Sequence, residues 1–359
     1  MPERDLDRAP PVTTRPTVLY ITGLGRSGST LLDLLLGELD GYISTGELRG
    51  LWRYGLVEGW LCGCRQPIRS CPFWGPVLER VGLDRIDPAT VAETQRRHLR
   101  LRPRCLARIW LFRRFGVGLP HDLASYGRMM AELYRSVSDL SGARVVVDSS
   151  KWPQDALLLS ACADVDLFVV HLVRDPRGVA NSWLKPRDNV ANPTGKPSQV
   201  LHPVFTATRW LAWNGAVHAL VRRWLGRQYM YLRYEEFSRD PASALTRITN
   251  MVEGRARPSS AFLDHTRATL GPNHTAYGNR SRFVTGEITI RGDERWREEM
   301  RTKDKLLATL PALPLLTAFG YPVLPPAAAQ PATERQPADA PTAEAGAPGP
   351  APRRPGQGR

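Results

Sequence analysis

Glycines and small hydroxyl residues between Thr22 and Thr30 (TGLGRSGST) form a pattern typical of anion binding. Gly23 and Gly28 stand where a chain turns sharply after a strand and brings its backbone N–H groups close to a ligand. A helix beginning near Ser29 adds its dipole and the unpaired N–H donors of its first turn. We therefore expect an anion to bind to this loop. The candidate binding residues are Gly25, Arg26, Ser27, Gly28, Ser29 and Thr30.

The loop differs at one position from the loops that bind nucleoside triphosphates. Its spacing matches the pattern G-x-x-x-x-G-K-[ST], except that Ser29 stands in the place of the lysine. In a triphosphatase that lysine neutralises the β- and γ-phosphates, so its loss argues against hydrolysis of ATP or GTP. Arg26, inside the loop, supplies positive charge instead.

A second anion-binding pattern lies in the segment Val173–Ser182 (VRDPRGVANS). Arg174 can direct two N–H groups at a phosphate, and Ser182 can donate a hydroxyl from the helix that follows. Asp175-Pro176 is also a usual helix start, an N-cap followed by proline. That structural interpretation explains neither Arg174 nor Ser182.

Together the two segments resemble sulfotransferases that use 3′-phosphoadenosine 5′-phosphosulfate (PAPS). GRSGST is similar to their loop for the 5′-phosphosulfate, in which a polar residue replaces the lysine, and Arg174 with Ser182 is similar to their 3′-phosphate element. The resemblance spans about Thr17 to Tyr321. It implies PAPS as the donor, a hydroxyl-bearing acceptor and no metal ion.

Two further segments add candidate donor-binding residues by resemblance. Tyr231–Phe237 (YLRYEEF) resembles the family's R-Y-E segment, which implies that Tyr234 lies near the adenine, although a buried strand aromatic is the alternative. His274–Phe283 (HTAYGNRSRF) resembles the loop that closes over the 3′-phosphate in bacterial members. Its candidates are Arg280 and Arg282, with Arg282 better placed by spacing.

Transfer of a sulfuryl group by in-line displacement needs a base for the acceptor's proton and positive charge around the transferring oxygens. The segment Ser44–Arg49 (STGELR) resembles tyrosylprotein sulfotransferases in its Glu-x-Arg spacing, which implies Glu47 as the base. A surface ion pair between Glu47 and Arg49 is the alternative. His171 lies inside a predicted strand, so we expect a core residue and not a base.

Lys151 follows the apolar run Arg144–Asp148 and is one of only five lysines among 49 basic residues. It matches the lysine that similar sulfotransferases place on the bridging oxygen of the leaving phosphate. Arg26 completes the predicted catalytic set.

Two other functions compete with the sulfotransferase hypothesis. An apolar strand ending in Asp148 also resembles the magnesium-binding element of a P-loop kinase or NTPase. The net charge of +14 is compatible with a non-catalytic module that binds nucleotides or other polyanions. The basic residues are spread along the chain and no nucleic-acid module is recognisable, so no nucleic-acid partner is expected.

The order of the apolar runs predicts an α/β fold. The predicted strands are Val18–Thr22, Arg144–Asp148, Leu167–Val173 and Tyr229–Tyr234, and the predicted helices lie at about 153–163, 178–184, 205–225, 241–252 and 294–310. Runs that are apolar on both faces are typical of parallel sheets covered by helices. We expect a three-layer sandwich with a central parallel sheet of about five strands, the P-loop NTPase-like sulfotransferase fold, with the donor at the carboxyl ends of the strands.

Composition predicts three regions: a flexible arm at 1–16, a sulfotransferase domain at 17–322 and a disordered Pro/Ala-rich tail at 323–359. Within the domain, residues 41–142 form an insertion that we expect to cover the acceptor site. Its Arg-rich stretch at 96–114 could touch a membrane surface or an acidic substrate, although a solvated helix face is the plainer interpretation. No apolar run is long enough to span a membrane and none resembles a signal peptide, so we expect a cytoplasmic protein.

Three of the five cysteines, Cys62, Cys64 and Cys71, are close together in the insertion. They could supply three ligands of a zinc site, but no fourth ligand is evident nearby and C-x-C is not the common spacing. A structural thiol cluster or a local disulfide is therefore the preferred interpretation, and no metal ion is expected.

Overall fold

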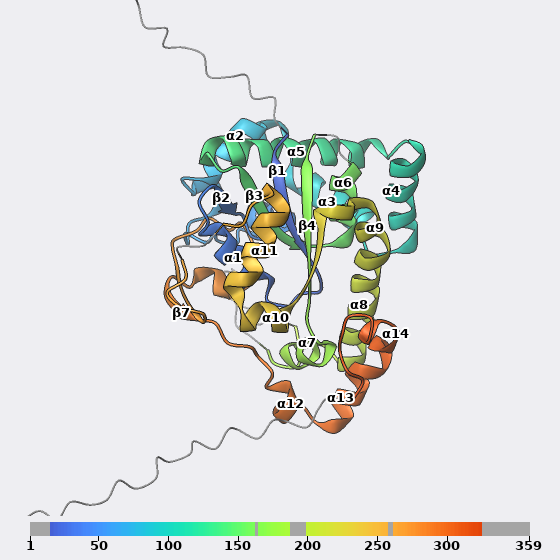
Figure 1. The fold of residues 1–359 in the computed structure, drawn as a ribbon. Helices are drawn as coiled ribbons and strands as arrows, with labels where there is room; N and C mark the ends of the chain where they lie inside the picture. The colour runs from blue at the N-terminus through green and yellow to red at the C-terminus, as the bar shows by residue number, and fades with distance from the viewer. Residues whose placement is uncertain (1–14, 162–163, 187–198, 258–260, 325–359) are drawn as a thin grey trace, which may run out of the picture. The chain divides into compact units, whose positions relative to one another are not determined.

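A five-stranded parallel sheet forms the centre of the fold in the computed structural model, which describes residues 15–161, 164–186, 199–257 and 261–324 (Figure 1). Its strands are β1 (Thr17–Thr22), β2 (Tyr42–Ser44), β3 (Val145–Lys151), β4 (Asp166–Val173) and β5 (Tyr229–Arg233). They lie in the order β2-β3-β1-β4-β5, and every neighbouring pair is parallel. β1 is therefore central, and the glycine-rich loop that follows it has strand ends on both sides.

Helices pack on both faces of the sheet and around its carboxyl edge. Their bounds are α1 (Ser29–Gly37), α2 (Trp74–Val81), α3 (Pro88–His98), α4 (Pro103–Phe115), α5 (His121–Ser141), α6 (Pro153–Ala161), α7 (Pro176–Trp183), α8 (Pro203–Ala216), α9 (Arg222–Leu225), α10 (Tyr234–Arg239), α11 (Pro241–Glu253), α12 (Trp296–Glu299), α13 (Thr302–Thr309) and α14 (Leu313–Leu316). β6 (Arg267–Leu270) and β7 (Gly286–Thr289) form a separate antiparallel pair.

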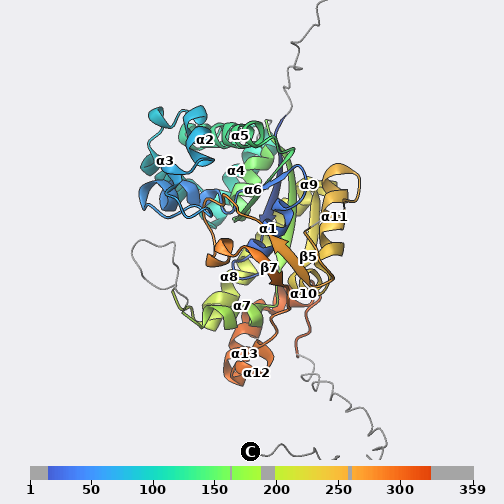
Figure 2. The same cartoon turned by 90° about the vertical axis from the view of Figure 1, so that its left-hand side faces the viewer.

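Alternate side chains of the strands enter two different cores, which produces three layers. In β1, Val18 and Tyr20 pack in a core with α5 and α6, whereas Leu19 and Ile21 pack in a core with α1 and α11. Figure 2 shows α5 and α11 on opposite sides of the sheet. The near-continuous apolar runs in the sequence follow from this burial on both faces.

The segment 41–142 begins inside the sheet. Its residues Tyr42–Ser44 form β2, which pairs with β3, and this edge strand was not predicted because three residues give too little alternation to recognise. The rest of the segment contains a π-helical turn at Leu51–Val57 and then α2 to α5. α2 and α3 both pack against α5, so most of the segment lies on one face of the sheet.

The prediction of a three-layer α/β fold with a five-stranded parallel sheet is confirmed. The predicted helix at 294–310 is instead two short helices, α12 and α13, and the one at 205–225 passes through a π-helical turn at Val217–Val221. The predicted arm and tail lie outside the described residues, apart from 15–16 and 323–324. Within the described residues, no helix is long and apolar enough to cross a bilayer.

Candidate active site

The loop between β1 and α1 approaches its neighbours so closely that two of its glycines cannot be replaced. Gly23 has a φ of 134°, and a Cβ there would lie 2.1 Å from the backbone oxygen of Leu172. Gly28 has a φ of 87°, and its Cβ would meet the Tyr234 ring at 2.7 Å. Both the backbone conformation and the space therefore require glycine.

The loop presents backbone N–H groups and one arginine at the start of α1. Gly28 precedes the first helical residue and offers no side chain to cap the helix. Arg26 has a φ of 75°, uncommon for a residue with a side chain, and its guanidinium lies 4.7 Å from the Trp183 ring centroid. The arrangement suits an anion, because helix dipole, amide donors and a cation lie at one place.

Lys151 and Glu47 form an ion pair beside this loop. Lys151 ends β3 with a φ of 77°, and its backbone oxygen accepts hydrogen bonds from the Thr22 hydroxyl at 2.7 Å and the Trp213 indole at 2.9 Å. Glu47 follows β2 and donates its backbone N–H to the Tyr277 oxygen at 2.9 Å. Glu47 and Lys151 are about a hundred positions apart in the sequence. The fold brings their carboxylate and ammonium groups together at the carboxyl edge of the sheet.

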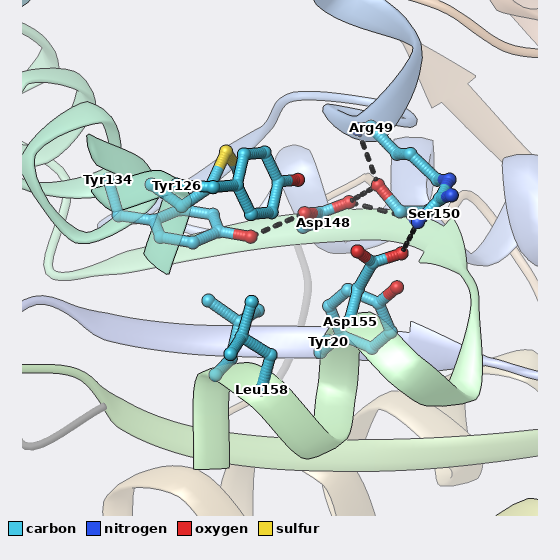
Figure 3. Close-up of a pocket in the computed structure, with 10 residues that line it drawn as sticks. Tyr20, Arg49, Tyr126, Tyr134, Asp148, Ser150, Asp155 and Leu158 are labelled. Carbon is cyan, nitrogen blue, oxygen red and sulfur yellow. Dashed lines mark hydrogen bonds and ion pairs between the residues drawn. The ribbon is translucent and has the colours of Figure 1, made fainter. Parts of the chain in front are cut away.

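Arg49 lies next to Glu47 in the chain but belongs to a different, structural network (Figure 3). Its guanidinium pairs with Asp155, donates to the Leu99 backbone oxygen at 2.8 Å and lies 4.2 Å from the Trp152 ring centroid. These contacts connect the end of α3 to α6. A surface pair between Glu47 and Arg49, the alternative weighed from the sequence, is wrong, because each pairs with another residue.

Asp148 is buried, and its oxygens accept hydrogen bonds from protein donors (Figure 3). The Tyr134 hydroxyl donates to one oxygen at 2.6 Å, and the backbone N–H of Ser150 donates to the other at 2.8 Å. Burial raises the pKa of Asp148 to about 6, although bonds from Ser150 and Tyr134 oppose the rise. This environment does not favour the magnesium-binding role of the kinase hypothesis, since the carboxylate is already used inside the core.

Arg174 connects the second predicted anion site to the first. It is 6% exposed, and its guanidinium donates to the Arg26 backbone oxygen at 3.1 Å and lies 4.6 Å from the Tyr234 ring centroid. Asp293 also contacts it, with a carboxylate oxygen 3.2 Å from Nη2. The pKa of Asp293 is lowered to about 2, mainly by its hydrogen bond with Arg295 and to a smaller extent by Arg174. The cation of this second site is therefore already paired with an anion of the chain.

The helix after Arg174 has the predicted structural start as well. Asp175 accepts the backbone N–H of Arg177 at 2.9 Å, and Pro176 is the first residue of α7. Ser182 lies near the end of the same helix and is 7% exposed. The helix-start interpretation of the segment is therefore confirmed, and it is compatible with the predicted phosphate role of Arg174, which directly follows β4.

Tyr234 is buried against the loop and against Arg174. It is the first residue of α10, follows β5 directly, and accepts the backbone N–H of Asp293 at its hydroxyl at 3.1 Å. The placement beside Gly28 locates it at the wall of the candidate site. The predicted strand Tyr229–Tyr234 thus ends one residue earlier, at Arg233.

The geometry does not support the predicted phosphate role of Arg282. This residue is fully buried, and its guanidinium donates to the backbone oxygens of Thr275 at 3.1 Å and Leu61 at 2.6 Å. Through these contacts Arg282 connects the loop at Thr275 to the loop at Leu61. Arg280, two residues earlier, is exposed at the start of a 3-10 turn, Arg280–Phe283. Of the two arginines, only Arg280 is accessible to a ligand.

His171 is a core residue, as predicted. It is fully buried in β4, and its ring nitrogens lie 2.8 Å from the Tyr229 hydroxyl and 2.9 Å from the Asn214 amide oxygen. Burial lowers the pKa of His171 to about 4.

Asp33 and Asp293 were not singled out from the sequence. Asp33 is fully buried in α1, interacts electrostatically with Lys151 and Glu47, and accepts a hydrogen bond from the Ser44 hydroxyl at 2.5 Å. Burial raises the pKa of Asp33 to about 8, against the opposing effect of the Ser44 bond. A charged residue inside an otherwise apolar helix was the available signal for Asp33, whereas Asp293 lies in a loop with no pattern.

Comparison with known proteins gives one family. A model of the sulfotransferase family matches residues 18–255, a range that includes all five strands of the central sheet. A search of curated proteins found no match.

Solved sulfotransferase structures are similar over most of the chain. The sulfotransferase domain from the Synechococcus PCC 7002 olefin synthase is 19% identical, with a TM-score of 0.45 over 89% of this chain and 99% of that one. The domain from the curacin biosynthetic pathway is 15% identical, with a TM-score of 0.46 over 86% and 99%. A sulfotransferase from Alicyclobacillus acidocaldarius is 13% identical, with a TM-score of 0.35 over 85% and 96%.

The environment of Asp33 predicts a pH-dependent stability. Because the pKa of Asp33 is about 8 in the folded chain and 3.8 in its ordinary state, the folded state keeps this proton while the unfolded state loses it. The contribution of Asp33 to the free energy of unfolding must therefore fall as pH rises from about 4 to 8, by about 1.4 kcal/mol per unit of pKa difference. Asp33→Asn should gain stability relative to wild type across that window.

Urea unfolding of both proteins between pH 4 and 8 measures this difference. Asp84→Asn is the matched control, because Asp84 is exposed and pairs only with its neighbour Arg85 among the described residues. If the free energies of unfolding of wild type and Asp33→Asn differ by the same amount at every pH, Asp33 is ionised in the folded state.

Proposed function

Because this chain belongs to the sulfotransferase family, we propose that it transfers the sulfuryl group of PAPS to a hydroxyl acceptor. The observation that carries the proposal is the contact between two anion-binding elements, since Arg174 donates directly to the backbone of Arg26 in the glycine-rich loop. Two such elements side by side suit a nucleotide with phosphate groups at both its 5′ and 3′ positions. A single loop would suit any phosphate.

In the proposed complex, the 5′-phosphosulfate lies against the loop. Backbone groups from Gly25 to Thr30 and the positive end of α1 bind its oxygens. The candidate side chains are Arg26, Ser27, Ser29 and Thr30. Ser27 and Ser29 are already buried, so their hydroxyls would act close to the loop, and Arg26 supplies the charge that a lysine provides in triphosphatases.

The 3′-phosphate is proposed to bind Arg174 and Ser182, from the end of β4 and from α7. Nη2 of Arg174 contacts both the backbone oxygen and the carboxylate of Asp293, so a phosphate at Arg174 would exchange the carboxylate for another anion. Tyr234 packs against both Gly28 and Arg174, which supports a place beside the adenosine. Arg280 remains a candidate at the accessible side, and Arg282 is not retained.

The proposed chemistry uses the Glu47–Lys151 pair. The acceptor oxygen attacks sulfur, its proton passes to the Glu47 carboxylate, and the bond from sulfur to the 5′-phosphate oxygen breaks. Lys151 and Arg26 stabilise the negative charge on the transferring oxygens and on the leaving phosphate. Lys151 can serve both groups because its backbone is fixed at the edge of the sheet while its ammonium lies against Glu47.

The acceptor is proposed to enter beside Glu47, under the segment 41–142. Tyr54, Trp60 and Tyr277 form an aromatic cluster there, with the Tyr54 and Tyr277 rings stacked at 4.2 Å. Tyr277 also accepts the backbone N–H of Glu47. Sugars, lipids, phenols and peptides carry suitable hydroxyls, and an aromatic wall can bind the apolar part of any of them.

Nucleotide binding tests the proposal against its rivals. Calorimetric titration of the purified chain should show binding of 3′,5′-ADP that needs no magnesium and exceeds the binding of ATP. A magnesium-dependent preference for ATP would overturn the proposal in favour of a kinase or NTPase. Donor binding without turnover of labelled PAPS on a broad set of hydroxyl acceptors would favour a non-catalytic binding module.

Glu47→Gln tests the base. The amide keeps the shape of the side chain but cannot accept the acceptor's proton, so turnover should fall by roughly 10²–10⁴-fold while 3′,5′-ADP binding is kept. Single-turnover assays with labelled donor measure the rate. Glu132→Gln, which makes the same change in a surface pair with Arg135, is the control and should retain full activity. Undiminished turnover in Glu47→Gln would assign the base elsewhere.

Asp293→Asn tests the anion exchange at Arg174. Without the competing carboxylate, 3′,5′-ADP should bind about tenfold more tightly, which corresponds to ~1.4 kcal/mol. Titration with 5′-AMP, which lacks the 3′-phosphate, should show no such gain. Glu294→Gln removes a negative charge from the same loop, where Glu294 pairs with Arg297, and serves as the control for general electrostatics. Equal gains in the two variants would refute a specific exchange.

A further inference from the structure

The three clustered cysteines acquire a fourth partner from the far end of the chain. Cys62, Cys64, Cys71 and His274 each offer one ligand atom, and these atoms all lie within 4.8 Å of one another. His274 follows Cys71 by more than two hundred positions, which is why no local spacing revealed it. Three sulfurs and one imidazole nitrogen are a common ligand set of structural zinc sites. We propose that these four residues bind one zinc ion.

Three of four distances between the ligand atoms match a single tetrahedral ion, and the fourth, from Cys71 to His274, is shorter. Cys71 Sγ lies 3.6 Å from Cys62 Sγ and 3.6 Å from Cys64 Sγ, and His274 Nδ1 lies 3.2 Å from Cys71 Sγ and 3.8 Å from Cys62 Sγ. Ligands about 2.3 Å (sulfur) and 2.0 Å (nitrogen) from zinc at tetrahedral angles would be roughly 3.5–3.8 Å apart.

The same distances exclude the local disulfide that the sequence favoured. A disulfide places its sulfurs about 2.05 Å apart, whereas the Sγ atoms here are 3.6 Å apart and all three cysteines are free. Of the two alternatives preferred from the sequence, the local disulfide is therefore wrong for these residues, whereas a cluster of free thiols agrees with the structure. Two of the thiols, Cys62 and Cys71, are buried, which shields the site from solvent.

Hydrogen bonds and a ring contact orient the residues of the cluster, as they usually do for the ligands of a zinc site. The backbone N–H of Trp74 points at the Cys71 sulfur at 3.5 Å, and its indole donates to the His274 backbone oxygen at 2.6 Å. The Phe73 ring stacks on the His274 imidazole, with ring centroids 5.3 Å apart. Contacts of this kind fix the orientation of ligands and are part of most metal sites.

The turn that carries Cys62 and Cys64 is tightly bound to the loop that carries His274. Gly63 donates its N–H to the Thr275 oxygen at 2.9 Å, and a Cβ on Gly63 would lie 2.1 Å from the Asn273 side chain. Arg65 closes the turn with a φ of 66°, an uncommon conformation for a residue with a Cβ. This close approach brings the two distant segments into ligand range.

A buried arginine offsets the charge of the proposed site. Three thiolates, one neutral imidazole and Zn²⁺ carry a net charge of −1. Arg282 is fully buried beside this cluster, contacts the backbone of Leu61 and Thr275, and forms no ion pair with a carboxylate among the described residues, although Cys62 first and then Glu47 interact with it electrostatically. A buried cation without an ion-pair partner is costly, so an anionic zinc centre nearby would stabilise it.

The zinc would hold the loop that contacts Glu47, the base of the proposed function. Ala276 and Tyr277 follow His274 closely, and they exchange backbone hydrogen bonds with Thr45 and Glu47 at 2.8 and 2.9 Å. The proposed role of this metal ion is structural. It connects the segment 41–142 to the loop that supports Glu47.

Metal analysis of the full-length chain, purified under reducing conditions without chelators, tests the proposal. We expect about one zinc per chain. Cobalt exchanged into the site should give the intense visible d–d bands of tetrahedral Co²⁺ and a thiolate charge-transfer band in the near ultraviolet. Chain that is folded by circular dichroism yet takes up no zinc or cobalt would overturn the proposal, as would iron in place of zinc or a disulfide among the three cysteines.

Variants assign the ligands. Cys64→Ser and His274→Asn should lose most of the bound metal and shift the thermal midpoint downwards. Cys105→Ser, which changes a buried cysteine of α4 outside the cluster, should keep one zinc and is the matched control. Because metal content is measured without donor or acceptor, a failure of the sulfotransferase proposal would leave this result unaffected. Full metal occupancy in both ligand variants would show that the ion lies elsewhere.

Discussion

The backbone oxygen of Lys151 is the point on which the candidate site depends. It accepts hydrogen bonds from the Thr22 hydroxyl and the Trp213 indole, and the N–H of Gly23 also points to it. These donors fix the end of β3 against the end of β1, and they hold Lys151 in a left-handed backbone conformation that costs free energy for a residue with a Cβ. The bend directs the lysine side chain towards Glu47 at the place where the glycine-rich loop begins.

Sequence alone was sufficient for the parts of the site that follow strands directly. Strands buried on both faces give short, continuous apolar runs, and the carboxyl ends of parallel strands meet at one edge. The loop after β1, Lys151 at the end of β3 and Arg174 at the end of β4 were therefore predicted, and the structure brings Arg174 into contact with Arg26 and Lys151 into contact with Glu47. Their roles in binding and catalysis remain proposals.

The residues that sequence analysis missed or misassigned are joined by contacts between distant, irregular segments. Asp293 reaches Arg174 from a loop, His274 reaches the cysteines across two hundred positions, and Arg282 turns into the interior although its spacing suggested a phosphate ligand. No helical or strand period encodes such contacts, because each depends on where a loop returns to the sheet. The short edge strand β2 was missed for a related reason, since its position is determined by β3.

The Arg174–Asp293 pair has a consequence for how ionic strength should act on this protein. Salt ordinarily weakens the binding of a phosphate to an arginine by screening their attraction. Here the same screening also weakens the internal contact that a phosphate would replace at the proposed site, so the two effects partly cancel. The chain carries its own counterion at this position, and the affinity of the site for polyanions should depend less on salt than the net charge of +14 would suggest.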